Sequence, residues 1–342
     1  MVTKVLHLHF GKEGGAERFF VNLARALSEN GFEQRFVIRP GRSWHGQVAA
    51  LGPVIQNNYR RVSLSSVFLT WRLRRLLRTW RPDVIMGWQP RASRLIPRQT
   101  EAVAITRLGD YPVHLKNMRH TDCIVTNTPG IAERCHSLGW MGSTRVISNF
   151  PREVTPVPID RAALKTPSDA FVISASGRFV PRKGFDTLLR AAARVPSAWL
   201  WLLGDGKTRR ELEALAVELG IAARTRFTGW VDEPMHYVAA SDVFVMPSRH
   251  EPLGNVILES WHAGVPIVST ASEGPSWFIS DGVDALMCHI DDVAGMAEAI
   301  GRIREDRALA GRLVANGRAK LAAQFAKKRV LDQYLAVFEG AF

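Results

Sequence analysis

Short apolar or β-branched runs alternate with helical stretches along the whole 342-residue chain. This alternation is typical of parallel sheets whose strands are joined by crossover helices, and it predicts an α/β fold throughout. Strands are predicted at residues 2–9, 34–39, 83–86, 102–106 and 123–127 in the first half, and at 171–176, 199–204, 226–229, 243–247 and 266–269 in the second. Each half is therefore predicted to be a Rossmann-like, doubly wound domain.

A proline-rich stretch separates the two halves. Residues 149–167 contain Pro151, Pro156, Pro158 and Pro167 and show little periodicity, which is typical of a linker. We therefore predict domains at residues 1–150 and 171–325, a linker at 151–170, and a C-terminal helix at 326–342 that can pack back on the first domain. Two such domains would leave a cleft that the carboxyl ends of both sheets face. Proteins of α/β fold bind ligands at those ends.

Composition places the chain among ordinary globular proteins, since 46% of the residues are apolar and 23% are charged. The first apolar run is short and contains His7 and His9, so no signal peptide is expected. No stretch approaches the roughly 18 apolar residues that span a bilayer. The three cysteines form no C-x-x-C pair and are expected to be buried, reduced thiols.

The net positive charge of the chain comes entirely from its first half. Residues 1–150 contain 22 Lys and Arg against 9 Asp and Glu, whereas residues 151–342 contain 23 of each kind. Ten arginines and a single acid, Asp83, lie between Arg60 and Arg98. Such an asymmetry suggests that the first half meets something anionic.

A helix predicted at residues 67–80 carries much of this charge. Its projection separates an apolar arc from a basic face, namely Leu69, Leu73, Leu76, Leu77 and Trp80 opposite Arg72, Arg74, Arg75 and Arg78, with Phe68 and Trp71 among the arginines. A solvated basic helix explains this pattern. A surface that contacts the acceptor or docks on anionic lipid explains the aromatics as well. Nucleic acid is a third partner, but no recognisable binding module accompanies the charge.

Two adjacent glycines, Gly14 and Gly15, follow the first predicted strand and precede a helix that runs to about Leu27. Backbone N–H groups can approach a phosphate closely at such a place. The spacing is not G-x-G-x-x-G and the second strand ends in Arg39, so a nicotinamide dinucleotide site is not expected. A simple tight turn explains the glycines equally well.

Two cations, Arg178 and Lys183, leave the turn after the first strand of the second half. They could hold a diphosphate in place of Mg²⁺, although a solvated turn would look similar. Two acids follow a later buried strand, with Glu251 in the loop and Glu259 in the next helix. Carboxylates accept hydrogen bonds from vicinal diols, which suits the hydroxyl groups of a sugar nucleotide. The Leu253–Asn255 backbone opens that helix and can donate N–H groups to the same ligand.

Five segments in order resemble glycosyltransferase family 4, whose members are retaining enzymes of GT-B fold: residues 14–17, Arg178 with residues 183–184, and residues 204–206, 251–259 and 263–266. The resemblance implies that Glu259 holds the ribose hydroxyls and Glu251 the hydroxyls of the donor sugar. It implies that Arg178 and Lys183 bind the diphosphate while the Gly15 loop closes over it.

Further donor contacts follow from the same resemblance. The backbone near Gly229 and Val231 is expected to hold the nucleotide base, and donor binding extends along Leu253, Gly254, Asn255 and Val256. Family members need no metal, and the chain contains no Asp-x-Asp. The expected co-substrate is a UDP- or GDP-sugar, with no cofactor.

One position departs from the family pattern. Many relatives carry a His after the fourth strand, and Arg107 stands in its place here. Arg107 could stabilise the departing phosphate but cannot take a proton, because it is always charged. Asp110 is the nearer candidate for acceptor contact or general base. His114 and His120 are predicted to lie on a helix as surface or packing residues.

The resulting hypothesis is a retaining, metal-independent hexosyltransferase that acts on a glycan or glycolipid of lipopolysaccharide core or another bacterial surface polysaccharide. It would be cytoplasmic and peripheral on the inner face of the cytoplasmic membrane. A GT-B-fold sugar-nucleotide epimerase or phosphorylase is the alternative in chemistry, but no acid/base constellation or Schiff-base lysine is apparent. A basic nucleic-acid-binding protein is the alternative in class, and the neutral second half argues against it.

Overall fold

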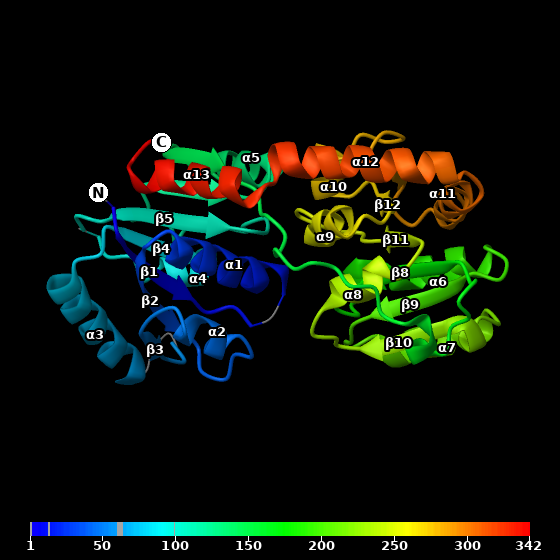
Figure 1. The fold of residues 1–342 in the computed structure, drawn as a ribbon. Helices are drawn as coiled ribbons and strands as arrows, with labels where there is room; N and C mark the ends of the chain where they lie inside the picture. The colour runs from blue at the N-terminus through cyan, green and yellow to red at the C-terminus, as the bar shows by residue number, and fades with distance from the viewer. Residues whose placement is uncertain (1, 13, 60–63, 99) are drawn as a thin grey trace. The chain divides into compact units, whose positions relative to one another are not determined.

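The computed structural model describes residues 2–12, 14–59, 64–98 and 100–342. Glu13 of the glycine loop, and Arg60 and Arg61 of the basic stretch, lie outside the described residues. The chain divides into two compact units, which are described separately. Unit 1 comprises Met1–Phe150 and Lys327–Phe342, and unit 2 comprises Pro151–Ala326 (Figure 1).

A parallel sheet in the order β3-β2-β1-β4-β5-β6-β7 forms the centre of unit 1 within the described residues. Its strands are β1 (Lys4–His9), β2 (Glu33–Ile38), β3 (Val54–Gln56), β4 (Val84–Trp88), β5 (Val103–Leu108), β6 (Cys123–Thr126) and β7 (Ser143–Val146). β1 is buried on both faces, as is usual for a parallel sheet covered by helices.

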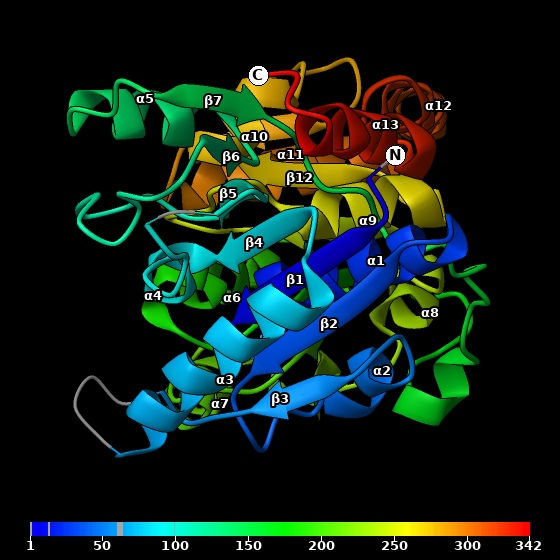
Figure 2. The same ribbon diagram turned by 90° about the vertical axis from the view of Figure 1, so that its left-hand side faces the viewer.

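Helices cover both faces of this sheet. They are α1 (Gly15–Glu29), α2 (His45–Ala49), α3 (Leu64–Trp80), α4 (Gln89–Ser93), α5 (Pro129–Ser137) and α13 (Lys327–Phe338). α1 and α13 pack on the face that carries Val5, whereas α3 packs on the face that carries Leu6. Figure 2 shows α3 beside the strands of this sheet. The C-terminal segment 327–342 is therefore part of the unit 1 core.

Unit 2 has a second parallel sheet, in the order β10-β9-β8-β11-β12-β13. Its strands are β8 (Val172–Ser176), β9 (Trp199–Leu203), β10 (Thr225–Gly229), β11 (Val243–Met246), β12 (Ile267–Thr270) and β13 (Leu286–Cys288). Its helices are α6 (Phe185–Ala193), α7 (Arg209–Glu218), α8 (Pro234–Ala239), α9 (Asn255–Ala263), α10 (Glu273–Phe278), α11 (Val293–Glu305) and α12 (Arg307–Gln324). Residues Arg161–Leu164, Pro181–Lys183 and Ala222–Arg224 form 3-10 helices.

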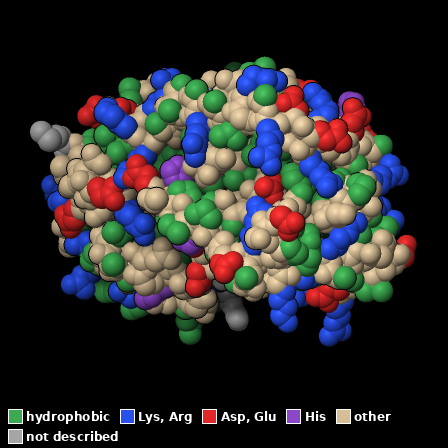
Figure 3. All heavy atoms as spheres, turned by 45° about the vertical axis from the view of Figure 1, so that its right-hand side comes forward, with side chains coloured by type: hydrophobic (Ala, Val, Ile, Leu, Met, Phe, Trp, Pro, Cys, Tyr) green, Lys and Arg blue, Asp and Glu red, His purple; other side chains and the backbone are tan. Residues whose placement is uncertain are grey.

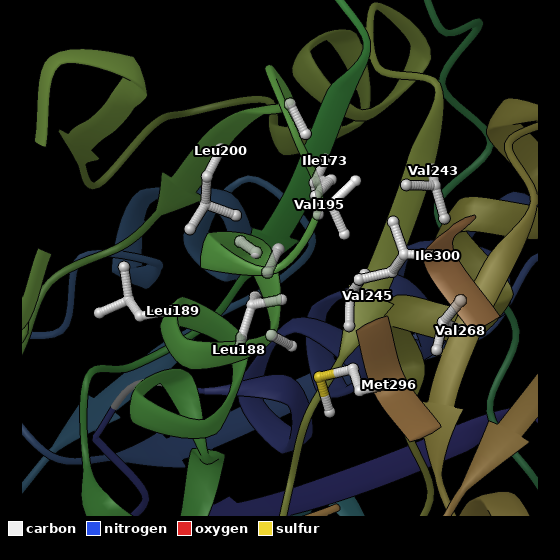
Figure 4. Packing of buried hydrophobic residues seen from close by; sticks show 14 of the residues in the cluster. Ile173, Leu188, Leu189, Val195, Leu200, Val243, Val245, Val268, Met296 and Ile300 are labelled. Carbon is white, nitrogen blue, oxygen red and sulfur yellow. The ribbon is translucent and has the colours of Figure 1, made fainter. Parts of the chain in front are cut away.

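The core of unit 2 lies between this sheet and its helices. Leu188 and Leu189 of α6 and Met296 and Ile300 of α11 lie among strand residues such as Val245 (Figure 4). Burial of these side chains removes apolar surface from water, which is the dominant stabilising contribution to such a fold. The same packing holds the carboxyl ends of the strands at one edge of the sheet.

The ten predicted strands are confirmed, with bounds that differ by one or two residues. Three further strands, β3, β7 and β13, are three or four residues long and lie at sheet edges. Each has only one neighbouring strand, and runs this short carry too little pattern to be identified from the sequence. The helix predicted around His114 and His120 is wrong, because residues 112–120 form a loop with turns.

The proline-rich stretch 151–170 is attached to unit 2 by several hydrogen bonds. Arg161 donates to the carbonyl oxygens of Ala170 and Ala240, and its guanidinium pairs with Asp242 at 3.0 Å. Cys123, Cys135 and Cys288 are buried free thiols, which confirms the expectation from sequence. Burial raises the pKa of Cys123 and Cys135 to about 11. No described helix combines the length and the apolar composition needed to cross a bilayer.

Two glycines of α12 provide a matched test of its packing. A Cβ on Gly317 would lie 2.3 Å from the ring of buried Trp261, whereas a Cβ on exposed Gly311 meets nothing within 4 Å. We expect Gly317→Ala to lower the free energy of unfolding by about 1–3 kcal/mol through overpacking. Gly311→Ala should raise it by about 0.5–1 kcal/mol through helix propensity alone. Urea unfolding followed by tryptophan fluorescence measures both, and a stabilised Gly317→Ala would contradict this account of the α9–α12 contact.

Candidate functional site

The strand order of unit 2 reverses between β8 and β11. The chain builds the sheet outward from β8 through β9 to β10, and then returns to place β11 on the other side of β8. In open parallel sheets the connections after two such strands diverge, which leaves a crevice at the carboxyl ends. The loops after β8 and β11 are the ones that carry Arg178, Lys183 and Glu251.

Lys183 and Glu251 meet across this reversal. Lys183 ends the 3-10 helix after β8, and its ammonium group forms an ion pair with Oε2 of Glu251 in the loop after β11. The hydroxyl of Ser248 donates a second hydrogen bond to the same oxygen, at 3.3 Å. The two side chains are 20% and 13% exposed, so both remain accessible to a ligand. The structure thus joins two of the predicted catalytic residues.

Gly184 sets the distance between these two loops. Its φ is +63°, and a Cβ at this position would lie 2.0 Å from the carbonyl oxygen of Pro247. Any larger residue would have to push the β8 and β11 connections apart. The backbone N–H of Arg249 also donates to the carbonyl oxygen of Arg182, at 2.8 Å. Lys183 is therefore fixed next to the segment that carries Glu251.

Arg249 links the segments around the Lys183–Glu251 pair. Its guanidinium donates to Asp186 of α6 at 2.7 Å, to Asp291 at 2.7 Å and to the carbonyl oxygen of Pro181 at 2.6 Å. The hydrogen bond from Arg249 lowers the pKa of Asp291. Three segments of unit 2 are linked through one side chain. Sequence reasoning did not single out Arg249, although it lies two residues before Glu251.

α9 begins directly behind Glu251. Gly254 is the N-cap of α9 with φ +95°, and Leu253 is buried at 2% exposure. Asn255 and Val256 form the first turn and are partly exposed. Glu259 lies in the second turn and is buried at 9% exposure, whereas Glu251 is only half-buried. A carboxylate buried in this way can accept hydrogen bonds from a diol only if the ligand extends into unit 2 beside the N-terminus of α9.

The remaining donor candidates of unit 2 lie on neighbouring connections. Arg178 is exposed two residues after β8. Gly229 ends β10 with φ +74°, and partly exposed Val231 follows it. Because β8, β9, β10 and β11 are parallel, these residues and Glu251 all emerge at one edge of the sheet.

Two residues at this edge, His250 and Glu273, were not singled out from the sequence. The carboxylate of Glu273, in the first turn of α10 after β12, accepts the Glu251 N–H at 3.1 Å and pairs with His250 at 2.8 Å. Partial burial opposes ionisation of Glu273, but the hydrogen bonds to His250 and to backbone N–H groups lower its pKa. Its place directly after a predicted strand is the signal that could have revealed it.

In unit 1, the predicted site residues also follow strands of the sheet. Gly14 is the N-cap of α1 and Gly15 its first residue, after β1. Asp110 is exposed after β5, and its carboxylate accepts the N–H of Tyr111 at 2.8 Å. A Cβ on Gly109 would lie 3.9 Å from Ala16, so the β5 connection runs beside the start of α1. Gly14, Gly15 and Asp110 thus lie at a common edge.

Arg107 differs from the expectation that it meets a departing phosphate. The side chain is 1% exposed, and its guanidinium donates to Asn149 and, at 3.5 Å, to the hydroxyl of Tyr334. It lies 4.9 Å from the ring centroid of Phe19 and 5.6 Å from that of Trp88. In this structure Arg107 joins β5 to α13 inside unit 1.

Two histidines of β1 are buried beneath the glycine loop. Nδ1 of His7 accepts the indole N–H of Trp88 at 3.2 Å, so its Nε2 carries the proton and donates to Gln34 at 3.0 Å. Nδ1 of His9 accepts the Gly11 N–H at 3.0 Å. Burial lowers the pKa of His7 to about 4 and that of His9 to about 3. Both rings are neutral at pH 7.

Known proteins resemble the chain over nearly its whole length. Residues 13–150 match Glycosyltransferase Family 4, and residues 157–320 match Glycosyl transferases group 1. The lipopolysaccharide core biosynthesis glycosyltransferase LpsE of Rhizobium meliloti (strain 1021) is 52% identical, over 97% of this chain and 98% of LpsE. LpsD of the same strain, with the same description, is 49% identical over 98% of each chain.

The fold has close counterparts among solved structures. HepE of Anabaena, in complex with UDP-glucose, matches with a TM-score of 0.86 and 19% identity, over 98% of this chain and 99% of HepE. At this identity the likeness concerns the fold. It confirms two Rossmann-like domains of the GT-B type.

The neutral histidines of β1 predict how stability depends on pH. The pKa of His7 is lower in the folded state than its ordinary 6.5, so the unfolded chain binds more protons between pH 6.5 and 4. Stability is therefore lost as the pH falls through this window, by about 3 kcal/mol for His7. We expect His7→Gln to flatten the pH dependence of urea unfolding. The matched variant at exposed His136 should leave it unchanged, and an equal slope in both variants would refute the assignment.

Proposed function

Because the chain belongs to glycosyltransferase family 4, we propose that it transfers a hexose from a nucleotide-diphosphate sugar to a lipopolysaccharide core acceptor. The whole-length similarity to LpsE and LpsD supports the pathway. The observation that carries the donor class is the Lys183–Glu251 pair at the strand-order reversal of unit 2. Membership of the family favours glycosyl transfer over the epimerase, phosphorylase and nucleic-acid-binding alternatives.

The donor roles follow from the charge and depth of each group. Lys183 and Arg178 are the cations that would meet a diphosphate, and both follow β8. Glu251 would accept hydrogen bonds from the donor-sugar hydroxyls while it orients Lys183. Glu259, deeper beside α9, would accept the ribose hydroxyls. The backbone at Gly229 and Val231 would meet the base of a UDP or GDP nucleotide.

The leaving group is the step on which these cations act. As the glycosidic bond to the donor phosphate breaks, negative charge develops on the diphosphate, and fixed cations stabilise it. Lys183 and Arg178 would supply this stabilisation without a metal ion. In a retaining transfer the acceptor hydroxyl would attack on the face of the sugar that the phosphate leaves, and that phosphate would help to remove its proton.

The general base is not assigned to Arg107. Its guanidinium is always charged and is enclosed in unit 1. Asp110 is exposed in the connection that follows the same strand, β5. It remains the residue that we propose for acceptor contact.

The proposed location depends on α3. Its buried residues Leu69, Leu73, Leu76 and Trp80 pack on the sheet, whereas Val67, Phe68 and Trp71 are 69%, 56% and 54% exposed. The exposed rings of Phe68 and Trp71 stack at 5.8 Å, and Arg72 and Arg75 lie over them at 5.8 and 5.9 Å. Exposed aromatics among arginines suit the headgroup region of an anionic membrane. We propose that α3 holds the enzyme on the cytoplasmic face of such a membrane.

Removing either member of the Lys183–Glu251 pair tests the donor site. We expect Lys183→Ala and Glu251→Ala each to lower transfer from the nucleotide sugar about 10²-fold or more, because a diphosphate or sugar contact is lost. The controls Arg190→Ala and Glu218→Ala remove exposed charges elsewhere in unit 2 and should leave the rate unchanged.

The double variant Lys183→Ala/Glu251→Ala separates catalysis from folding. Each single variant leaves one charge without its partner, which lowers the unfolding midpoint, and the double variant should restore much of that midpoint. Its transfer rate should stay low. Recovery of the rate together with the midpoint would show that the pair serves only the fold.

Vesicle binding tests the membrane proposal. Vesicles with anionic lipid should bind the protein at low salt and release it as salt rises, because each well-placed arginine contributes about 1 kcal/mol. Replacing Arg72, Arg74, Arg75 and Arg78 with Gln should reduce binding and spare donor hydrolysis. The control variant replaces Arg190, Arg194, Arg210 and Arg302 of unit 2 with Gln. Equal losses in both variants, or equal binding to neutral vesicles, would argue against α3 as the docking surface.

A further inference from the structure

Unit 1 contains a pocket that the donor site does not use. It has a volume of about 340 Å³ and is lined by Tyr59, Arg91, Arg94, His114, Lys116 and Asn117. We call it the basic pocket, because its described lining residues include two arginines, a lysine and a histidine and no acid. Its size lies at the lower end of the range of small-molecule sites, which is about 300–1,000 Å³.

The basic pocket is lined by the connections that follow β3, β4 and β5. Tyr59 follows β3, and residues 114–117 follow β5. Arg91 lies on α4, directly after β4, and Arg94 is its C-cap. The ring of Tyr59 stacks on that of Phe10, which follows β1, at 5.1 Å. In a parallel sheet these three connections leave at the carboxyl ends of their strands, which is where open α/β sheets bind ligands.

The walls of the basic pocket are held by contacts of their own. Arg91 donates to the carbonyl oxygen of Tyr59 at 2.8 Å. The loop that carries His114 and Lys116 is anchored by Met118, which is fully buried, and by a hydrogen bond from His120 to the carbonyl oxygen of Ile96 at 3.1 Å. Ligand-facing side chains therefore extend from fixed backbone.

The charge of the basic pocket is not neutralised by the protein. Neither Arg94 nor Lys116 forms an ion pair with a carboxylate in the part of the chain that the structure describes, and both are exposed. This differs from Lys183, which is paired with Glu251, and from Arg249, which is paired with two aspartates. Unneutralised cations around a concave surface favour an anionic ligand.

The other lining groups point to a sugar. The amide of Asn117 can donate to and accept from hydroxyl groups, and Tyr59 adds a phenolic hydroxyl and an aromatic ring. Under the proposed function Arg178 and Lys183 of unit 2 meet the donor diphosphate, so we assign the cations of unit 1 to the acceptor. We propose that the basic pocket binds a sugar of the acceptor that carries a phosphate or carboxylate group. This proposal rests on the glycosyltransferase function proposed above.

Titration of the intact protein with simple sugars tests the binding chemistry directly. The probes are glucose 6-phosphate, glucuronate and glucose, measured by calorimetry at low salt. We expect at least one charged sugar to bind and glucose to bind at least tenfold more weakly. The charged sugar with the higher affinity identifies phosphate or carboxylate as the recognised anion. Equal binding of all three, or no binding of the charged sugars, would overturn the proposal.

A double variant assigns that binding to the pocket. Arg94→Gln/Lys116→Gln should weaken binding of the charged sugar at least tenfold. Arg25→Gln/Arg145→Gln removes the same charge from exposed sites elsewhere in unit 1 and should change it less than twofold. Both variants should retain wild-type circular dichroism and UDP affinity. Equal weakening in the two variants would show that net charge, and not the pocket, attracts the sugar.

Activity and lipid binding separate this proposal from the others. With lipopolysaccharide core oligosaccharide as the acceptor, Arg94→Gln/Lys116→Gln should raise the acceptor KM at least tenfold and leave donor hydrolysis unchanged. A wild-type enzyme that hydrolyses no nucleotide sugar would refute the proposed function, whereas the sugar titrations would still decide the fate of the pocket. Loss of anionic vesicle binding in this variant, together with absent sugar binding, would identify a lipid headgroup as the occupant and overturn the proposal.

Discussion

The common direction of the strands is the constraint on which both units depend. In a parallel sheet every strand-to-helix connection leaves at the same edge, so residues far apart in sequence emerge together. Lys183 and Glu251 are 68 residues apart and form an ion pair, because the strand order sets β8 beside β11. In unit 1 the same direction brings the connections after β3, β4 and β5 together around the basic pocket. Burial of the strands on both faces keeps these edges fixed.

The sequence predicts the central strands because they are apolar on both faces. The three strands that it misses, β3, β7 and β13, are only three or four residues long, which is too short for a strand pattern to identify them. The sequence also identifies Lys183 and Glu251 individually, since each follows a buried strand. Their pairing could not be predicted from local sequence, because it depends on strand order. Arg107 shows another limit of prediction from local sequence. Its charge suggests an exposed side chain, yet Asn149 and Tyr334, which are distant in the chain, supply hydrogen-bond acceptors that allow its burial. The basic pocket could not be predicted either, because its lining residues come from three connections whose proximity depends on strand order.

The positive charge of the first half does not form one surface. Arg107 is enclosed among aromatic rings, the arginines of α3 are exposed beside Phe68 and Trp71, and Arg91 and Arg94 line the basic pocket. On the face shown in Figure 3, Lys and Arg side chains are interspersed with Asp and Glu. A net charge of +13 is thus a sum of separate local arrangements. Each arrangement has its own chemistry, and only side-chain surroundings distinguish them.

Pairing of cations also bears on how tightly each site should hold its ligand. The charge of Lys183 is partly compensated by Glu251, so a diphosphate bound there as proposed would compete with an existing ion pair. Donor affinity would then depend on the contacts proposed for Glu259 with the ribose and for the β10 connection with the base. Such an arrangement would favour release of the nucleotide after transfer, because the free nucleoside diphosphate would meet a cation that already has a partner. The uncompensated basic pocket lacks such a competitor, and its hold on an anionic sugar should therefore depend more strongly on salt than the hold of unit 2 on its nucleotide.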